Sequence, residues 1–205
     1  MSKKNIIKKT IKENNGYLFI EEANDIGVSR TYLSDYITKE NLEKVDNGIY
    51  ILPNIWPDNL YILNKKNKRV IFSHETALML HKLTECEIYQ ISVTVPKTYN
   101  ATHLRKNGCI VYHNDDVLYN LGVITISTSY NNDVKVYDME RTICDIIKHK
   151  NKIEIGIFTN AVREYVKRKD KNITKLLEYA EIMKIKNKVL SYLEVLLWYI
   201  IIVIN

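Results

Sequence analysis

One stretch of fourteen residues, ANDIGVSRTYLSDY, most constrains what this 205-residue chain can fold into. It begins at the small residue Ala23, reaches Gly27 four positions later, and continues with the apolar Val28. Apolar residues return six and nine positions after the glycine, at Leu33 and Tyr36. This spacing is typical of two helices joined by a sharp turn, the motif whose second helix lies in the major groove of DNA. The stretch therefore predicts a helix-turn-helix.

The flanking segments complete a winged version of this motif. Upstream, KKNIIKKTIKENNG has isoleucines at helical spacing opposite lysines, and Asn15-Gly16 provides a helix stop. Downstream, LEKV and IYIL enclose Asp46-Asn47-Gly48, and this pattern predicts a hairpin whose Asn-Gly pair favours positive φ. Residues 1–56 are accordingly expected to form a winged helix-turn-helix domain.

The second helix of the motif is expected to start at the N-cap Ser29, to end near Lys39 and to show one polar face. Arg30, near its N-terminus, is the best candidate for a guanine contact, whereas Lys44 and Asn47 of the wing would hold phosphates. The lysines of the first helix are further candidates for phosphate contacts. The predicted DNA-binding residues are Ser29, Arg30, Thr31, Ser34, Asp35, Thr38, Lys39, Lys44 and Asn47.

A second interpretation of residues 1–56 is a small domain that only packs or contacts proteins. These residues carry eight Lys+Arg and eight Asp+Glu, and this neutral balance favours that interpretation. The whole chain has a formal charge of +6, with the excess toward the C-terminus, which suits an anionic partner without identifying one.

Residues 57–205 are expected to form a second domain of mixed α+β type that ends in helices. A helix capped by Ser73 precedes β-rich runs at 91–96, 108–113 and 122–128. Helical patterns follow from Asp138 onward, beginning with DMERTICDIIKHK. The order helix, strands, helices indicates an α+β fold for the chain.

No catalytic, metal or cofactor motif stands out in the second domain. Its five histidines lie in different predicted elements without ligand spacing, no phosphate-binding loop occurs, and the three cysteines lack a C-x-x-C pair. We therefore predict no catalytic residue, no metal and no cofactor, and reduced thiols. Arg141 and Asp145, four apart, are expected to pair on the surface of a helix capped by Asp138, in a structural role.

The sequence also predicts a cytoplasmic protein without a membrane span. Lysines interrupt every apolar run before residue 17, so no signal peptide is indicated. The ten apolar residues from Val195 to Ile204 fall short of the roughly 20 that cross a bilayer.

Four segments together resemble the AbiEi family of bacterial antitoxins. They are GYLFIEEANDIGVSRTYLSDYITKENLEKVDNGIYIL, IFSHETALMLHKL, ISVTVP and VYDMERTICDIIK, and the resemblance covers about residues 5–197. It implies an N-terminal domain that represses its own operon at inverted repeats in the promoter, with readout by Ser29–Lys39 and a wing around Lys44–Gly48. It also implies a C-terminal domain that counteracts a nucleotidyltransferase-like AbiEii toxin in abortive phage infection, in a type IV system where direct toxin contact is not obligatory.

Two other functions stay open. One is a cytosolic transcriptional regulator whose C-terminal domain senses a small ligand. The other is an enzyme of unassigned type in residues 57–205. The terminal WYIIIVIN departs from the family pattern, so the resemblance does not define the C-terminal boundary.

Overall fold

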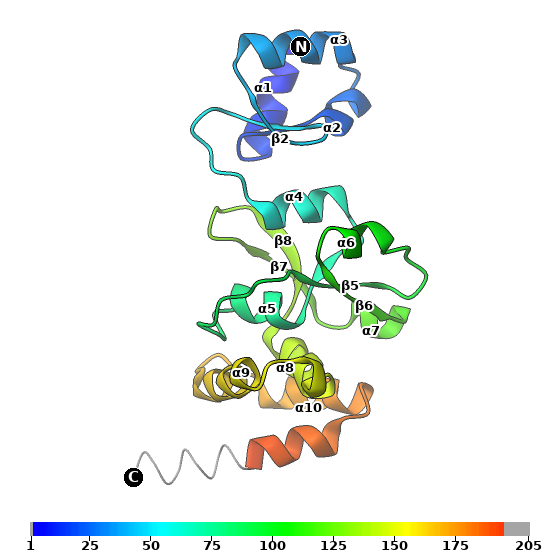
Figure 1. Ribbon diagram of the computed structural model, residues 1–205, viewed down its shortest axis with the longest axis vertical. Helices are drawn as coiled ribbons and strands as arrows, with labels where there is room; N and C mark the ends of the chain where they lie inside the picture. Colours follow the sequence, from blue (N-terminus) through cyan, green and yellow to red (C-terminus); the bar gives the residue numbers. More distant parts are fainter. Residues whose placement is uncertain (1, 195–205) are drawn as a thin grey trace. The chain divides into compact units, whose positions relative to one another are not determined.

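The computed structural model describes residues 2–194 and has an α+β fold divided into two compact units (Figure 1). The first unit extends to Lys66 and also includes Ser127–Asp133. The second contains Asn67–Ile126 and the residues from Val134 onward. The apolar tail from Val195 to Ile204 lies outside the described residues. No helix within residues 2–194 is long and apolar enough to cross a membrane.

The first unit combines four helices with a small antiparallel sheet. The elements are α1 (Lys3–Glu13), β1 (Tyr17–Phe19), α2 (Ile20–Asp25), α3 (Arg30–Lys39), β2 (Glu43–Asp46), β3 (Ile49–Ile51) and α4 (Asn59–Lys66). The sheet has the order β1-β3-β2, with β3 paired to both neighbours. The strand β1 occupies the short apolar piece between the first two helices.

An apolar core holds the three N-terminal helices together, and the predicted pattern supplies it. Ile7 and Ile11 of α1 pack with Leu33 and Tyr36 of α3, and Leu18 of β1 joins them. Ile7, Leu18 and Leu33 are at most 1% exposed. The helix stop after α1 is confirmed, since Asn15 and Gly16 both have positive φ, 50° and 91°.

Helix α4 was not predicted, and it moves the boundary of the first unit beyond residue 56. Hydrogen bonds of Asp58, just before α4, explain why α4 belongs to the first unit. Its backbone N–H donates to the Tyr17 hydroxyl at 2.7 Å, and its carboxylate accepts hydrogen bonds from Thr128 and Asn132. Asp58 thus ties the start of α4 to β1 through its backbone N–H and to the remote segment Ser127–Asp133 through its buried carboxylate.

The second unit has a five-stranded mixed sheet and a helical layer. The described elements are β4 (Ile71–Phe72), α5 (His74–Leu80), β5 (Ser92–Pro96), α6 (Thr102–Lys106), β6 (Ile110–Asn114), α7 (Asp116–Asn120), β7 (Val123–Ser127), β8 (Asp133–Tyr137), α8 (Met139–Lys148), η1 (Lys150–Lys152), α9 (Ile155–Lys167) and α10 (Ile173–Ile182). Residues 186–194 are also helical.

The sheet has the strand order β6-β5-β4-β8-β7. Strand β4 runs antiparallel to β5 and parallel to β8, and β5 runs parallel to β6. The predicted strands at 91–96, 108–113 and 122–128 are confirmed as β5, β6 and β7. The sequence interpretation missed β8, because its short sequence DVKVY alternates exposed and buried residues and has no continuous apolar run.

Helix α8 is the centre of the helical layer. Every residue from Glu140 to Ile147 is buried, and α8 packs against α5, α9 and α10 (Figure 1). The apolar cluster includes Ile143, Cys144 and Tyr165, each at most 1% exposed. A helix buried all round needs its polar groups paired internally, and this requirement governs the polar cluster described next.

Candidate functional site

The helix-turn-helix forms as the spacing predicts. Ala23 is fully buried where the helices meet, and its carbonyl accepts the Val28 N–H at 3.1 Å. Gly27 turns the chain with φ of +86°, a conformation that costs an L side chain roughly 1–2 kcal/mol. Val28, 2% exposed, fills the corner between α2 and α3.

Helix α3 has one buried and one exposed face. Leu33 and Tyr36 lie in the core, and Ile37 is half-buried against it. All nine residues predicted to bind DNA are exposed, seven of them at or within the bounds of α3 and two in the wing. The seven are Ser29, Arg30, Thr31, Ser34, Asp35, Thr38 and Lys39, and the two are Lys44 and Asn47.

Two details of this surface differ from the sequence expectation. Ser29 occupies the N-cap position of α3, but its side chain makes no capping hydrogen bond, so its hydroxyl is available to another acceptor or donor. In the wing only Gly48 has positive φ, +72°, and the Asn47 N–H donates to the Asp46 carboxylate at 2.6 Å. Within α3, the Thr38 hydroxyl already donates to the Ser34 carbonyl at 3.1 Å.

Ion pairs hold the wing and α1 beside this surface. The Asp46 carboxylate pairs with Lys66 at 2.7 Å, and this hydrogen bond lowers the pKa of Asp46. Lys4 pairs with Glu40 at 3.2 Å, which fastens the start of α1 to the end of α3. The first unit carries ten Lys+Arg and ten Asp+Glu in total, so any affinity for DNA must come from local placement of charge.

A second cluster lies inside the second unit, where the sequence predicted no site. The Nε2 of His74 lies 2.9 Å from the Nδ1 of His149, and potential ligand atoms of His74, His149 and Asp145 all fall within 4.8 Å of one another. His74 and Asp145 are each 1% exposed, and His149 is half-buried. The sheet-to-helix junction at β4–α5 and the end of α8 bring them together.

His74 is held tightly in this cluster. Its ring stacks on Tyr112 with centroids 3.4 Å apart, and its Nδ1 lies 2.9 Å from the Ser73 hydroxyl. The Thr94 hydroxyl in turn donates a hydrogen bond to the Ser73 hydroxyl at 2.9 Å. Burial lowers the pKa of His74 well below its usual value and lowers that of His149, so both rings are neutral at pH 7.

Arg141 and Asp145 form the predicted pair, but the predicted location was wrong. The Nε of Arg141 lies 3.2 Å from Oδ2 of Asp145, with both side chains at most 2% exposed. The pair is therefore internal, because α8 is covered on all sides by α5, α9, α10 and the sheet connections. Asp138 does cap the helix, accepting the Arg141 N–H at 2.8 Å.

One signal in the sequence pointed to this cluster. Asp145 and His149 are four apart in DIIKH, which places them on one helical face. Their partner His74 lies 71 positions before Asp145, a separation that the spacing of motifs does not reveal. His103 and His113, by contrast, are exposed, and His81 binds the Tyr137 carbonyl at 2.6 Å.

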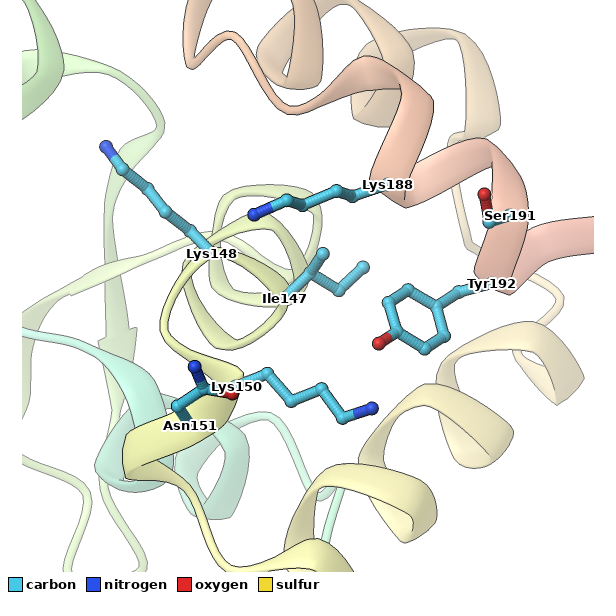
Figure 2. Close-up of a pocket in the computed structure, with 7 residues that line it drawn as sticks. All are labelled: Ile147, Lys148, Lys150, Asn151, Lys188, Ser191 and Tyr192. Carbon is cyan, nitrogen blue, oxygen red and sulfur yellow. The ribbon is translucent and has the colours of Figure 1, made fainter.

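A pocket of about 440 Å³ lies at the end of α8, and Figure 2 shows the residues that line it. Lys148, Lys150 and Lys188 line it with Tyr192. The Nζ of Lys150 lies 5.2 Å from the Tyr192 ring centroid and as far from that of Phe158, a cation–π arrangement that accounts for its position. Lys148 and Lys150, at and just beyond the C-terminus of α8, also interact favourably with the helix dipole, so the positions of these two lysines have a structural explanation.

No protein-family model matches the chain, and no curated protein matches it. Among solved structures, the chain is similar to the Rv2827c protein from Mycobacterium tuberculosis, known from a crystal structure. The similarity has a TM-score of 0.56 at 7% sequence identity and covers 86% of this chain and 70% of that chain. At that identity the likeness is one of fold alone.

Proposed function

We propose that this protein is the antitoxin of a bacterial AbiE-type toxin-antitoxin system and represses its own operon. In this proposal it acts in the cytoplasm, where the first unit binds inverted repeats in the promoter. The second unit counteracts a nucleotidyltransferase-like AbiEii toxin. The DNA-binding part is supported by the geometry of the first unit, and the toxin partner by the family resemblance of the sequence.

The separation of faces on α3 carries the DNA-binding proposal. The side chains of Leu33 and Tyr36 are buried in the core. The charged and hydroxyl-bearing residues on the other face of the helix are exposed, namely Arg30, Thr31, Ser34, Asp35, Thr38 and Lys39. Arg30 lies in the first turn, the part of a recognition helix that contacts base edges. Its guanidinium has the donor geometry for O6 and N7 of guanine.

The neutral charge of the first unit shapes how it should bind. Lys39 and Lys44 offer positive charge near the ends of the polar surface, but Asp35 in its middle would repel phosphate. We therefore expect Asp35 to face a base edge, where a carboxylate can accept a hydrogen bond from the N4 amino group of cytosine. Discrimination between DNA sequences should then depend on a small number of contacts to base edges.

The test is binding of the full-length protein to the DNA upstream of its own gene across a salt series, measured by fluorescence anisotropy. Specific retention that weakens with salt supports the proposal. A shuffled DNA of equal length reports non-specific binding. Equal affinity for both DNAs, or no binding, would contradict DNA recognition by the first unit.

Antitoxin function needs a separate test in cells. Expression of a downstream nucleotidyltransferase-like gene should arrest growth, and co-expression of this protein should restore it. A variant that no longer binds the operator should still restore growth, because the two activities are assigned to different units. Failure of the intact protein to restore growth would contradict the antitoxin assignment and leave the DNA-binding assignment unaffected.

A further inference from the structure

The cluster of His74, Asp145 and His149 has the composition and spacing of a metal site. It offers two imidazole nitrogens and a carboxylate, the ligands that zinc and related divalent ions accept. Two nitrogens bound to one tetrahedral ion at about 2.0–2.1 Å lie roughly 3.3 Å apart. The observed separation of the two ring nitrogens is 2.9 Å, so a few tenths of an ångström would admit an ion.

We propose that His74, Asp145 and His149 bind one divalent transition-metal ion of the zinc class, through Nε2, a carboxylate oxygen and Nδ1. Three protein ligands leave a fourth position for water or an exchangeable ligand. The site links the start of α5 to the end of α8. It lies in the second unit and does not depend on DNA binding or on the toxin.

Positive side chains surround the site. Lys148 and Lys152 lie close enough to act electrostatically on both imidazole rings. These cations and Arg141 also oppose an added positive charge, so we expect a lower affinity than that of a closed structural zinc site.

The groups around the three ligand side chains have the arrangement that metal sites use to orient their ligands. Metal-bound histidines usually give their other ring nitrogen a hydrogen-bond partner, and Ser73 Oγ occupies that place at Nδ1 of His74. Ligating carboxylates are in turn hydrogen-bonded, and Arg141 Nε binds Oδ2 of Asp145. Stacking on Tyr112 fixes the plane of the His74 ring.

The backbone of His74 provides an independent observation. Its φ is +48° at the first residue of α5, in the left-handed region that residues other than glycine seldom adopt. Such strain clusters at ligand clamps and other functional positions. From this position the His74 imidazole reaches the end of α8, where its Nε2 lies 2.9 Å from Nδ1 of His149.

The test uses untagged full-length protein, stripped of metal and titrated with Co²⁺, with Zn²⁺ as competitor. We expect one Co²⁺ per chain with tetrahedral ligand-field absorption, displaced by Zn²⁺. The variant His149→Gln should lose stoichiometric binding, and the matched control His103→Gln, at an exposed histidine of the same unit, should retain it. Circular dichroism checks that each variant folds.

The variant Ser73→Ala removes the orienting hydroxyl, which also accepts a hydrogen bond from the Thr94 hydroxyl, and should weaken binding by about 10–100-fold. X-ray absorption of the zinc-loaded protein should show nitrogen and oxygen ligands and no sulfur, which separates this site from binding at the exposed Cys86. The proposal is overturned by a wild-type protein that binds neither ion, by His149→Gln binding as wild type does, or by sulfur ligation. Each of these results would leave the cluster as a hydrogen-bonded network.

Discussion

Arg141 and Asp145 are joined by an ion pair inside the helical layer, with Nε and Oδ2 3.2 Å apart and both side chains at most 2% exposed. The same guanidinium donates through Nη1 to the carbonyls of Leu118 and Leu121. It also lies 4.2 Å from the centroid of the Tyr137 ring. Arg141 therefore connects α8 with α7, with the loop after α7 and with β8.

Replacing Arg141 by Met should destabilise the protein by about 3–5 kcal/mol. The substitution keeps an apolar stem but leaves the Asp145 carboxylate without its cation, and burial already raises the pKa of that carboxyl. Urea unfolding monitored by circular dichroism measures the change. The matched control Arg163→Met removes an exposed arginine of α9 and should change stability by no more than about 0.5 kcal/mol. Similar effects for the two variants would show that the buried pair is dispensable.

Gly122 should tolerate a methyl group much less well than Gly108. Both have left-handed φ, +77° and +81°, so alanine is strained at each by roughly 1–2 kcal/mol. A Cβ on Gly122 would also lie 2.8 Å from Cβ of Arg141, whereas nothing lies within 4 Å of one on Gly108. Melting temperatures of Gly122→Ala and Gly108→Ala provide the comparison. An equal loss in both would mean that the loop around Gly122 can move away from α8.

Local sequence pattern predicted the first unit because its core is built from residues close in the chain. Ala23, Val28 and Leu33 mark the turn and both helices within one short stretch, so their spacing was enough to predict that they are buried. Helix α4 escaped prediction because its place depends on Asp58, whose partners Thr128 and Asn132 lie far along the sequence.

The histidine cluster shows the same limit more clearly. Spacing puts Asp145 and His149 on one face of α8, but their contact with His74 depends on the packing of α5 against α8. The burial of Arg141 likewise follows from its contacts with α7, with the loop after α7 and with β8, which local pattern does not connect with α8 but which cover this side of the helix. Contacts between elements distant in sequence are what pattern analysis cannot supply.

The three cysteines should differ sharply in reactivity. Cys86 is exposed, whereas Cys109 and Cys144 are buried. Burial raises the pKa of both buried thiols, that of Cys144 to about 12, and only the thiolate reacts readily. An aromatic disulfide reagent should therefore modify one thiol per native chain and three after unfolding in urea. In the Cys86→Ser variant the native reaction should disappear, and its persistence would show that a buried cysteine becomes accessible.

Acidification should destabilise the second unit in part through His81. Burial lowers the pKa of His81, with the nearby Arg168 adding to the shift and the carboxylates of Asp138 and Glu140 opposing it. Because the folded state disfavours the proton, the unfolded chain binds it first, and stability falls as pH drops below about 6.5. Unfolding free energies at several pH values should decline less steeply for His81→Gln than for wild type. Identical slopes would assign the decline to other groups.

Arg30 and Lys44 should affect DNA binding in different ways. If Arg30 contacts a guanine edge, Arg30→Ala should cost about 1–3 kcal/mol on the operator and reduce discrimination against shuffled DNA. If Lys44 contacts a phosphate, Lys44→Ala should weaken binding to both DNAs about equally and reduce the salt slope by about one. The control Arg105→Ala removes an exposed arginine of α6, in the second unit, and should change neither quantity. Operator affinity and discrimination that stay unchanged in Arg30→Ala would remove this residue from the recognition surface, whatever Lys44 does.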